Sequence, residues 1–207
     1  MDIQNAYDEW SVTYDADENL TRDLDQTTTR SLLADFRPDS ILELGCGTGK
    51  NTVFLARIGK QVHALDFSQG MVEKARAKVQ AENVHFEMAD LTLRWPCKAD
   101  AYDLIVCNLV LEHIENLSHI FSEAQRTLRP GGWFFINELH PFKQYDGKKA
   151  RFSRGGQTVE VDAFVHHISD FIGAAMENGL KLLSLKEFWH EEDEGKLPRL
   201  VSFLFEL

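Results

Sequence analysis

The chain has 207 residues, of which 43% are hydrophobic and 27% charged, and its formal net charge is −11. These values fit one soluble globular domain, because no apolar run approaches the roughly 20 residues of a membrane span. The acidic, polar start does not resemble a secretory signal, and the negative charge argues against nucleic acid as a substrate. Three cysteines without framework spacing (Cys46, Cys97 and Cys107) predict reduced thiols in a cytoplasmic setting.

The N-terminal 38 residues divide into two parts. Residues 1–19 carry several aromatic side chains between acidic ones, so we expect this lead-in to be docked rather than free. Apolar residues then recur at helical spacing from Leu20 to Phe36 and predict a helix, with Asn19 at the N-cap position. Pro38 ends this helix.

From residue 40 onward, short aliphatic runs alternate with helical patterns, which is typical of an α/β sheet. Strands are predicted at 40–44, 61–66, 84–89, 101–107 and 133–139. Helices are predicted at 48–58, 68–81 and 117–128, with Gly59 as a C-cap. A helix at 168–178, capped by Gly179, precedes two last strands at 181–189 and 199–207.

The most informative stretch follows the first predicted strand and reads Glu-Leu-Gly-Cys-Gly-Thr-Gly from Glu43 to Gly49. Alternate glycines permit positive φ and let the backbone approach a ligand. The loop then leads to a helix start, whose free N–H groups favour an acceptor or an anion. A dinucleotide loop needs a third glycine where Lys50 stands, which disfavours a nicotinamide oxidoreductase. A tight turn without a ligand remains the alternative.

Asp66 ends the second predicted strand, 21 residues after Gly45. A carboxylate in this position can accept both ribose hydroxyls of a nucleotide. The alternative is an N-cap for the next helix, although Ser68 is available for that role.

Taken in order and spacing, these motifs resemble the class I S-adenosylmethionine (SAM) methyltransferases, and in particular their small-molecule, type 11/12-like members. The resemblance is strongest over residues 40–139 and includes Asp90 after the third strand, Asn108 after the fourth and Leu-Arg-Pro-Gly-Gly before the fifth. It implies a Rossmann-like, seven-stranded, mostly parallel sheet with helices on both faces and an antiparallel C-terminal hairpin.

The resemblance also implies SAM as cofactor and S-adenosylhomocysteine as product. It assigns the ribose to Asp66, the adenine amino group to Asp90 and the sulfur end to the backbone of Asn108. A carboxylate suits an amino group because it only accepts hydrogen bonds, although Asp90 could equally be a turn residue. The full set of cofactor-binding residues implied is Tyr14, Glu43, Gly45, Cys46, Gly47, Gly49, Asp66, Phe67, Met71, Asp90, Leu91, Asn108 and Leu109.

By the same resemblance, residues 1–207 form a single methyltransferase domain in four parts. These are an N-terminal helical cover (1–38), the SAM-binding core (39–139), an acceptor-side insertion (140–167) and a final helix with an edge hairpin (168–207). A helix that merely packs on the sheet edge is the alternative to the cover.

Residues 143–163 form the only basic region: Lys143, Lys148, Lys149, Arg151 and Arg154. The Gly155-Gly156 pair between β-prone runs predicts a hairpin, which either shapes acceptor specificity or is simply solvated. The acidic run at 191–194 is expected to be a solvated turn rather than a metal site.

Methyl transfer requires mainly proximity, orientation and exclusion of water, and it needs a general base only when the acceptor must lose a proton. His140 is our first candidate base and His113 our second, since histidine titrates near neutrality. His166 and His167 are further candidates. We expect no metal, because no tight ligand spacing occurs.

Three functions remain open after these motifs. A small-molecule acceptor is favoured over a protein or RNA acceptor and over a non-catalytic SAM-binding domain. No short motif encodes the acceptor, the methylated atom (oxygen, nitrogen, sulfur or carbon) or the oligomeric state.

Overall fold

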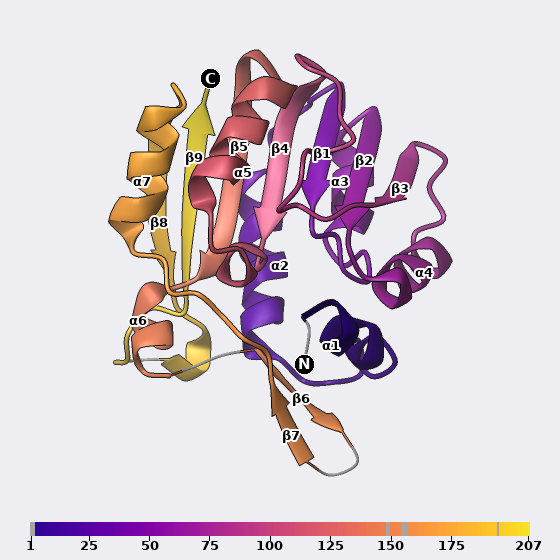
Figure 1. Ribbon diagram of the computed structural model, residues 1–207, viewed down its shortest axis with the longest axis vertical. Coiled ribbons are helices and arrows are strands. Elements are labelled where there is room, and N and C mark those ends of the chain that lie inside the picture. The colour runs from indigo at the N-terminus through magenta and orange to yellow at the C-terminus, as the bar shows by residue number, and fades with distance from the viewer. Residues whose placement is uncertain (1–2, 148–149, 155–156, 194) are drawn as a thin grey trace.

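The computed structural model describes residues 3–147, 150–154, 157–193 and 195–207. Its centre is a seven-stranded sheet in the order β3-β2-β1-β4-β5-β9-β8 (Figure 1). The strands are β1 (Ser40–Leu44), β2 (Gln61–Asp66), β3 (Val84–Met88), β4 (Tyr102–Asn108), β5 (Leu128–Leu139), β8 (Lys181–Phe188) and β9 (Leu200–Glu206). Strands β1 to β5 are parallel, whereas β9 runs antiparallel to β5 and β8. The expected fold class is therefore confirmed.

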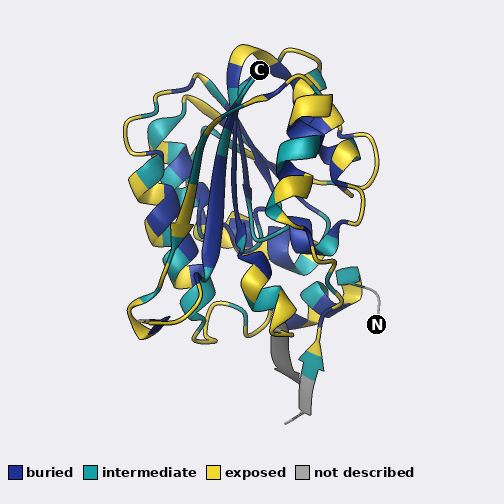
Figure 2. Ribbon diagram, turned by 90° about the vertical axis from the view of Figure 1, so that its left-hand side faces the viewer, coloured by how far each residue is buried: buried dark blue, intermediate teal, exposed yellow. Residues whose placement is uncertain are grey.

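Helices cover both faces of the sheet. One face carries α2 (Leu20–Leu32), α3 (Thr52–Ile58) and α4 (Gln69–Lys78), and the other carries α5 (Leu117–Thr127) and α7 (Ile168–Glu177). Leu104 and Val106 of β4 pack in the first layer, and Ile105 and Cys107 in the second. Since successive strand residues point to opposite faces, a strand covered on both sides must be apolar throughout. Figure 2 shows the central strands as deeply buried, whereas the edge strands β3 and β8 carry exposed residues.

Small elements gather at the carboxyl ends of the parallel strands. They are α1 (Ile3–Trp10), the 3-10 turns η1 (Leu111–His113) and η2 (Glu191–Asp193), α6 (Pro141–Tyr145), and the hairpin of β6 (Arg151–Arg154) and β7 (Gln157–Glu160). Helix α1 lies across these strand ends (Figure 1). Ala6 and Trp10 of α1 pack against Val161, so α1 and the segment after β7 support each other. None of the helices in the described ranges is long and apolar enough to cross a membrane.

Several local signals at the ends of elements are confirmed. Asn19 and Ser68 accept backbone N–H groups in the first turns of α2 and α4. Gly179, with φ of +75°, closes α7 by donating to a carbonyl of its last turn. The predicted hairpin is formed by β6 and β7. Its Gly155-Gly156 pair lies outside the described residues, as do Lys148 and Lys149 of the basic region.

Other boundaries differ from the prediction. Helix α3 begins at Thr52 rather than Thr48, because the glycine loop continues to residue 51. Helix α2 ends at Leu32, before the predicted Phe36. The docked aromatic lead-in was expected, but its helical form in α1 was not predicted.

The acidic run at 191–194 was expected to be a solvated turn, and the structure describes its residues 191–193, whereas Glu194 lies outside the described residues. Asp193 is 2% exposed and accepts two hydrogen bonds from Arg199, at 2.6 and 2.8 Å, while Lys143 lies 3.3 Å away. Burial opposes ionisation of Asp193, but the hydrogen bonds and charge of Arg199 outweigh it and lower the pKa to about 2. This turn is therefore anchored by a buried ion cluster and is not merely solvated.

We expect Asp193→Asn to lower the free energy of unfolding by on the order of 2–3 kcal/mol at neutral pH, because two partly buried cations lose their partner. A carboxylate with a lowered pKa stabilises the fold above its unfolded pKa of about 4 and loses that contribution as pH falls. The difference between wild type and variant should therefore shrink as pH falls through about 4 towards about 2. Urea unfolding at several pH values measures both effects. The exposed neighbour change Glu191→Gln should shift stability by less than about 0.5 kcal/mol; equal losses in the two variants would contradict the anchoring role.

Candidate active site

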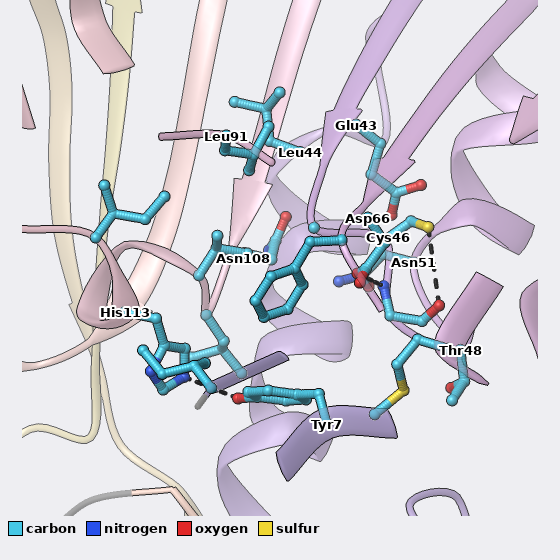
Figure 3. Close-up of a pocket in the computed structure, with 18 of the residues that line it drawn as sticks. Tyr7, Glu43, Leu44, Cys46, Thr48, Asn51, Asp66, Leu91, Asn108 and His113 are labelled. Atoms are coloured by element: carbon cyan, nitrogen blue, oxygen red, sulfur yellow. Dashed lines mark hydrogen bonds between the residues drawn. The ribbon is translucent and has the colours of Figure 1, made fainter. Parts of the chain in front are cut away.

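A cavity of about 390 Å³ lies at the carboxyl ends of β1, β2 and β4, beneath α1 (Figure 3). Ligands of open α/β sheets bind outside the carboxyl ends of the strands, at the point where the strand order reverses. The wall combines the glycine loop, strand-end acids and α1. Its position alone makes it the candidate active site.

The glycine loop forms one wall of the cavity. Gly45 has φ of +68°, and a Cβ there would lie 2.2 Å from Val110 Cγ2, so no larger residue fits. Gly47 also has positive φ, but a Cβ there would meet no atom within 4 Å. The backbone at Gly47 is thus open to a ligand. Gly49 differs, because its Cβ would lie 2.9 Å from Val79 Cγ2; it packs against the end of α4 and does not line the cavity.

Asp66 fixes the glycine loop to the end of β2. Its two oxygens accept the N–H groups of Gly47 at 2.8 Å and Ser68 at 2.9 Å. Burial raises the Asp66 pKa to about 6, and the backbone hydrogen bonds oppose a larger rise. Each carboxylate oxygen retains a lone pair for a ligand in the cavity. Ser68 supplies the N-cap of α4, so Asp66 is not needed for that role.

A second buried carboxylate, Asp25 of α2, collects three asparagine side chains. The amide nitrogens of Asn51, Asn108 and Asn137 donate to it at 2.8, 2.5 and 2.7 Å. Because a carboxylate only accepts, each amide must turn its oxygen away from Asp25. All three amide oxygens are buried without a hydrogen-bond partner in the described residues. Asn51 and Asn108 line the cavity, so Asp25 holds two side chains of its wall in place.

The cavity is therefore rich in acceptors and acids. Glu43 also lines it, accepts a hydrogen bond from Thr52 at 2.6 Å and has a pKa raised to about 8, mainly by burial. Arg22 lies nearby, but its guanidinium donates to the carbonyls of Tyr14 and Asp17 and lies over the Tyr14 ring. Such a concentration of acids favours a ligand that carries positive charge.

The opposite end of the cavity is formed by Tyr7 of α1 and His113 of η1 (Figure 3). The Tyr7 hydroxyl lies 2.8 Å from His113 Nε2, and His113 Nδ1 lies 3.0 Å from the carbonyl oxygen of Asp162. A carbonyl only accepts, so Nδ1 carries the proton and Nε2 of the neutral ring accepts from Tyr7. Burial raises the Tyr7 pKa well above its usual value, which keeps the phenol protonated.

His140, the first candidate base, is not brought to the cavity. Its side chain is 1% exposed, Nε2 lies 2.8 Å from Glu187 and Nδ1 accepts the N–H of Phe142 at 3.1 Å. It caps α6, and both of its ring nitrogens are occupied. His166 bonds the Ile114 carbonyl and His167 caps α7, and neither lines the cavity.

Apart from Gly49, the structure brings every proposed cofactor-binding residue to the cavity wall. They are Tyr14, Glu43, Gly45, Cys46, Gly47, Asp66, Phe67, Met71, Asp90, Leu91, Asn108 and Leu109. Sequence reasoning missed Ile3, Gln4, Tyr7, Asp25 and Asn51, which also line it. The dense aromatic lead-in was a signal for Tyr7. No local signal marked Asp25, because its partners come from three other segments of the chain.

Comparison with known proteins shows which family the sequence resembles. Residues 42–136 match the family model described as "Methyltransferase domain". An uncharacterized methyltransferase of Emericella nidulans is 27% identical over 87% of this chain and 76% of its own length. The malonyl-[acyl-carrier protein] O-methyltransferase of Methylovorus sp. is 32% identical over 67% of this chain, and the demethylmenaquinone methyltransferase of Clavibacter sepedonicus is 31% identical over 66%. The chain spans only 50% and 58% of the length of these two relatives.

Solved structures show the same fold. A putative SAM-dependent methyltransferase from Listeria monocytogenes superposes with a TM-score of 0.76 at 21% identity, over 88% of this chain and 97% of that one. DhpI, solved in complex with S-adenosylhomocysteine (SAH), superposes with a TM-score of 0.75 at 20% identity, over 98% of this chain and 94% of that one.

The cavity fits SAM on its own chemistry. The cofactor carries a positively charged sulfonium and an ammonium group, and the wall offers the acids Asp25, Glu43 and Asp66. The open backbone at Gly47 leaves room for the ligand to approach. The matched family, the sheet order and this cavity together identify the chain as a class I SAM-dependent methyltransferase.

Proposed function

We propose that the chain transfers a methyl group from SAM to a small-molecule acceptor. The observation that carries this proposal is the acceptor end of the cavity, which α1 covers and which the Tyr7–His113 pair lines. An acceptor end that α1 covers suits a small acceptor better than a protein or RNA chain. Relatives named for demethylmenaquinone and for malonyl groups on a carrier protein agree with a small methylated moiety.

Within this proposal the chain's residues bind and orient the cofactor. The Asp66 carboxylate accepts the ribose hydroxyls, and Asp90 with the backbone of Leu91 receives the adenine. Asn51 and Asn108, whose side chains Asp25 holds in place, shape the wall around the cofactor. When bound, SAM supplies a methyl group already activated by a positively charged sulfur, so orientation and exclusion of water provide most of the catalysis.

For an acceptor that must lose a proton, Tyr7 and His113 form a relay. The Tyr7 oxygen accepts the acceptor's proton as its own proton passes to His113 Nε2. His113 is held ready by the Asp162 carbonyl on Nδ1, and Glu112 Oε1 lies 3.7 Å from Nε2, where it stabilises the imidazolium. Segment 140–167 would then contribute to the acceptor side through Asp162.

The first test concerns Asp66 and pH. Protonation of Asp66 removes acceptor capacity, so SAM affinity should fall about tenfold between neutral pH and about pH 5, one unit below the pKa of about 6. Asp66→Asn should weaken SAM binding at pH 7 by about 1.5–3 kcal/mol and flatten the pH profile. Isothermal titration calorimetry measures both. A profile that is identical in wild type and variant would remove Asp66 from the cofactor site.

The second test concerns the relay. Tyr7→Phe preserves the ring but removes the hydroxyl, so kcat should fall by about 10²–10⁴-fold for an acceptor that loses a proton. SAM affinity should remain unchanged. Tyr145→Phe is the matched control, because Tyr145 also bonds a histidine, His167, but neither residue lines the cavity. Equal kcat values for Tyr7→Phe and wild type would rule out the relay.

The acceptor class is tested by incubating the protein with SAM labelled in its methyl group and fractionated cell extract. Label should appear in the small-molecule fraction and be lost with Tyr7→Phe. Label in protein or RNA would transfer the proposal to a macromolecular acceptor. SAM binding without transfer to any fraction would support a non-catalytic domain.

A further inference from the structure

A cluster of potential metal ligands lies on the sheet outside the cofactor cavity. It consists of His63 on β2 and of His85 and Glu87 on β3, the edge strand in Figure 1. The parallel register pairs His63 directly with His85, and Glu87, two residues further on, shares its face. None of the three lines the cavity. The cluster is therefore separate from the site described above.

The three ligand atoms are close enough for one ion. One atom from each side chain lies within 4.8 Å of the others, and His63 Nε2 lies 2.9 Å from Glu87 Oε2. Two ligands that bind one ion at about 2.1 Å can be at most about 4.2 Å apart. Small side-chain rotations are sufficient to reduce a separation of 4.8 Å to about 4.2 Å. His85 is exposed and Glu87 half-buried, so both can make them.

His63 has the second hydrogen bond that a metal-binding histidine requires. Its Nδ1 lies 2.7 Å from the Tyr102 hydroxyl, which fixes the ring and can accept the Nδ1 proton. Nε2, opposite Glu87, is then the ligand atom. In the metal-free chain the neutral ring can instead donate Nε2–H to Glu87; binding then moves this single proton to Nδ1, where Tyr102 accepts it, and leaves Nε2 for the ion.

Cys97 lies on the other side of the imidazole. Its sulfur is 3.9 Å from His63 Nδ1 and 3.4 Å from the Tyr102 hydroxyl. This sulfur therefore lies on the Nδ1 side of the ring, whereas Glu87 lies at Nε2. It belongs to the support behind His63 and not to the ligand set.

We propose that His63, His85 and Glu87 bind one divalent transition-metal ion of the Zn²⁺ type, with solvent in the remaining position. Two imidazoles and one carboxylate suit Zn²⁺, Co²⁺ or Ni²⁺, whereas Mg²⁺ and Ca²⁺ prefer oxygen ligands alone. The ion would link the edge strand β3 to β2. Because β2 ends at Asp66 and β3 leads to Asp90, the bound ion would stabilise the part of the cavity proposed for the ribose and adenine. Local spacing did not reveal this cluster, because strand pairing brings His63 and Glu87 together across 24 residues.

Titration calorimetry of the reduced, chelator-treated protein with Zn²⁺ tests the proposal, with Co²⁺ absorption as a report on ligand geometry. Wild type should bind one equivalent, and the melting temperature should rise with occupancy. His85→Ala and Glu87→Gln change side chains that are not fully buried, and each should weaken binding at least tenfold. His119→Ala is the control, because His119 is a histidine of α5 outside the cluster, and it should bind as wild type does.

Two outcomes would overturn the proposal. One is wild-type affinity in both His85→Ala and Glu87→Gln, which would place the ion elsewhere. The other is the absence of saturable Zn²⁺ binding to wild type below about 1 mM. Both are read from metal binding alone and are independent of methyl transfer.

Discussion

The active-site end of the sheet depends on one buried carboxylate, Asp25. It receives amide groups from the loop before α3, from the end of β4 and from β5, and so joins α2 to three other segments of the chain. A buried charge of this kind is tolerated only because several donors surround it. The same donors fix the orientation of the asparagine oxygens. Asp25 thus both holds the elements together and fixes the side chains of Asn51 and Asn108 in the cavity wall.

The charge of the cavity follows from this arrangement. Asp25, Glu43 and Asp66 are buried close to one another, and burial raises the pKa of each. A cationic ligand lowers the energy of their ionised forms. Methyl transfer converts a positively charged sulfonium into a neutral thioether. If these carboxylates contact the cofactor as proposed, they would hold its substrate form more strongly than its product form, which would favour exchange after each turnover.

Features encoded over short stretches of sequence could be predicted, and features that depend on distant partners could not. The glycine loop, the Asn19 and Ser68 caps and the strand ends at Asp66 and Asn108 follow from local spacing and backbone chemistry. His140 also follows a strand at the correct edge, but Pro141 begins a short helix that makes His140 its cap. Asp193 stands in an acidic run, and only the fold reveals that Arg199 and Lys143 surround it. Tyr7 required the docking of α1 over the sheet.

The candidate active site is divided between the stretch that matches the family and two segments outside it. The residues proposed for the cofactor lie mostly within 42–136, the stretch that matches the family. His113 also belongs to that stretch, but its two ring partners do not: Tyr7 comes from α1, and the Asp162 carbonyl from the segment after β7. The packing of Ala6 and Trp10 against Val161 joins these two outer segments to each other. A change in either segment would therefore alter the proposed acceptor side while leaving the glycine loop and Asp66 in place. A motif within 42–136 can thus predict the methyl donor without predicting the acceptor.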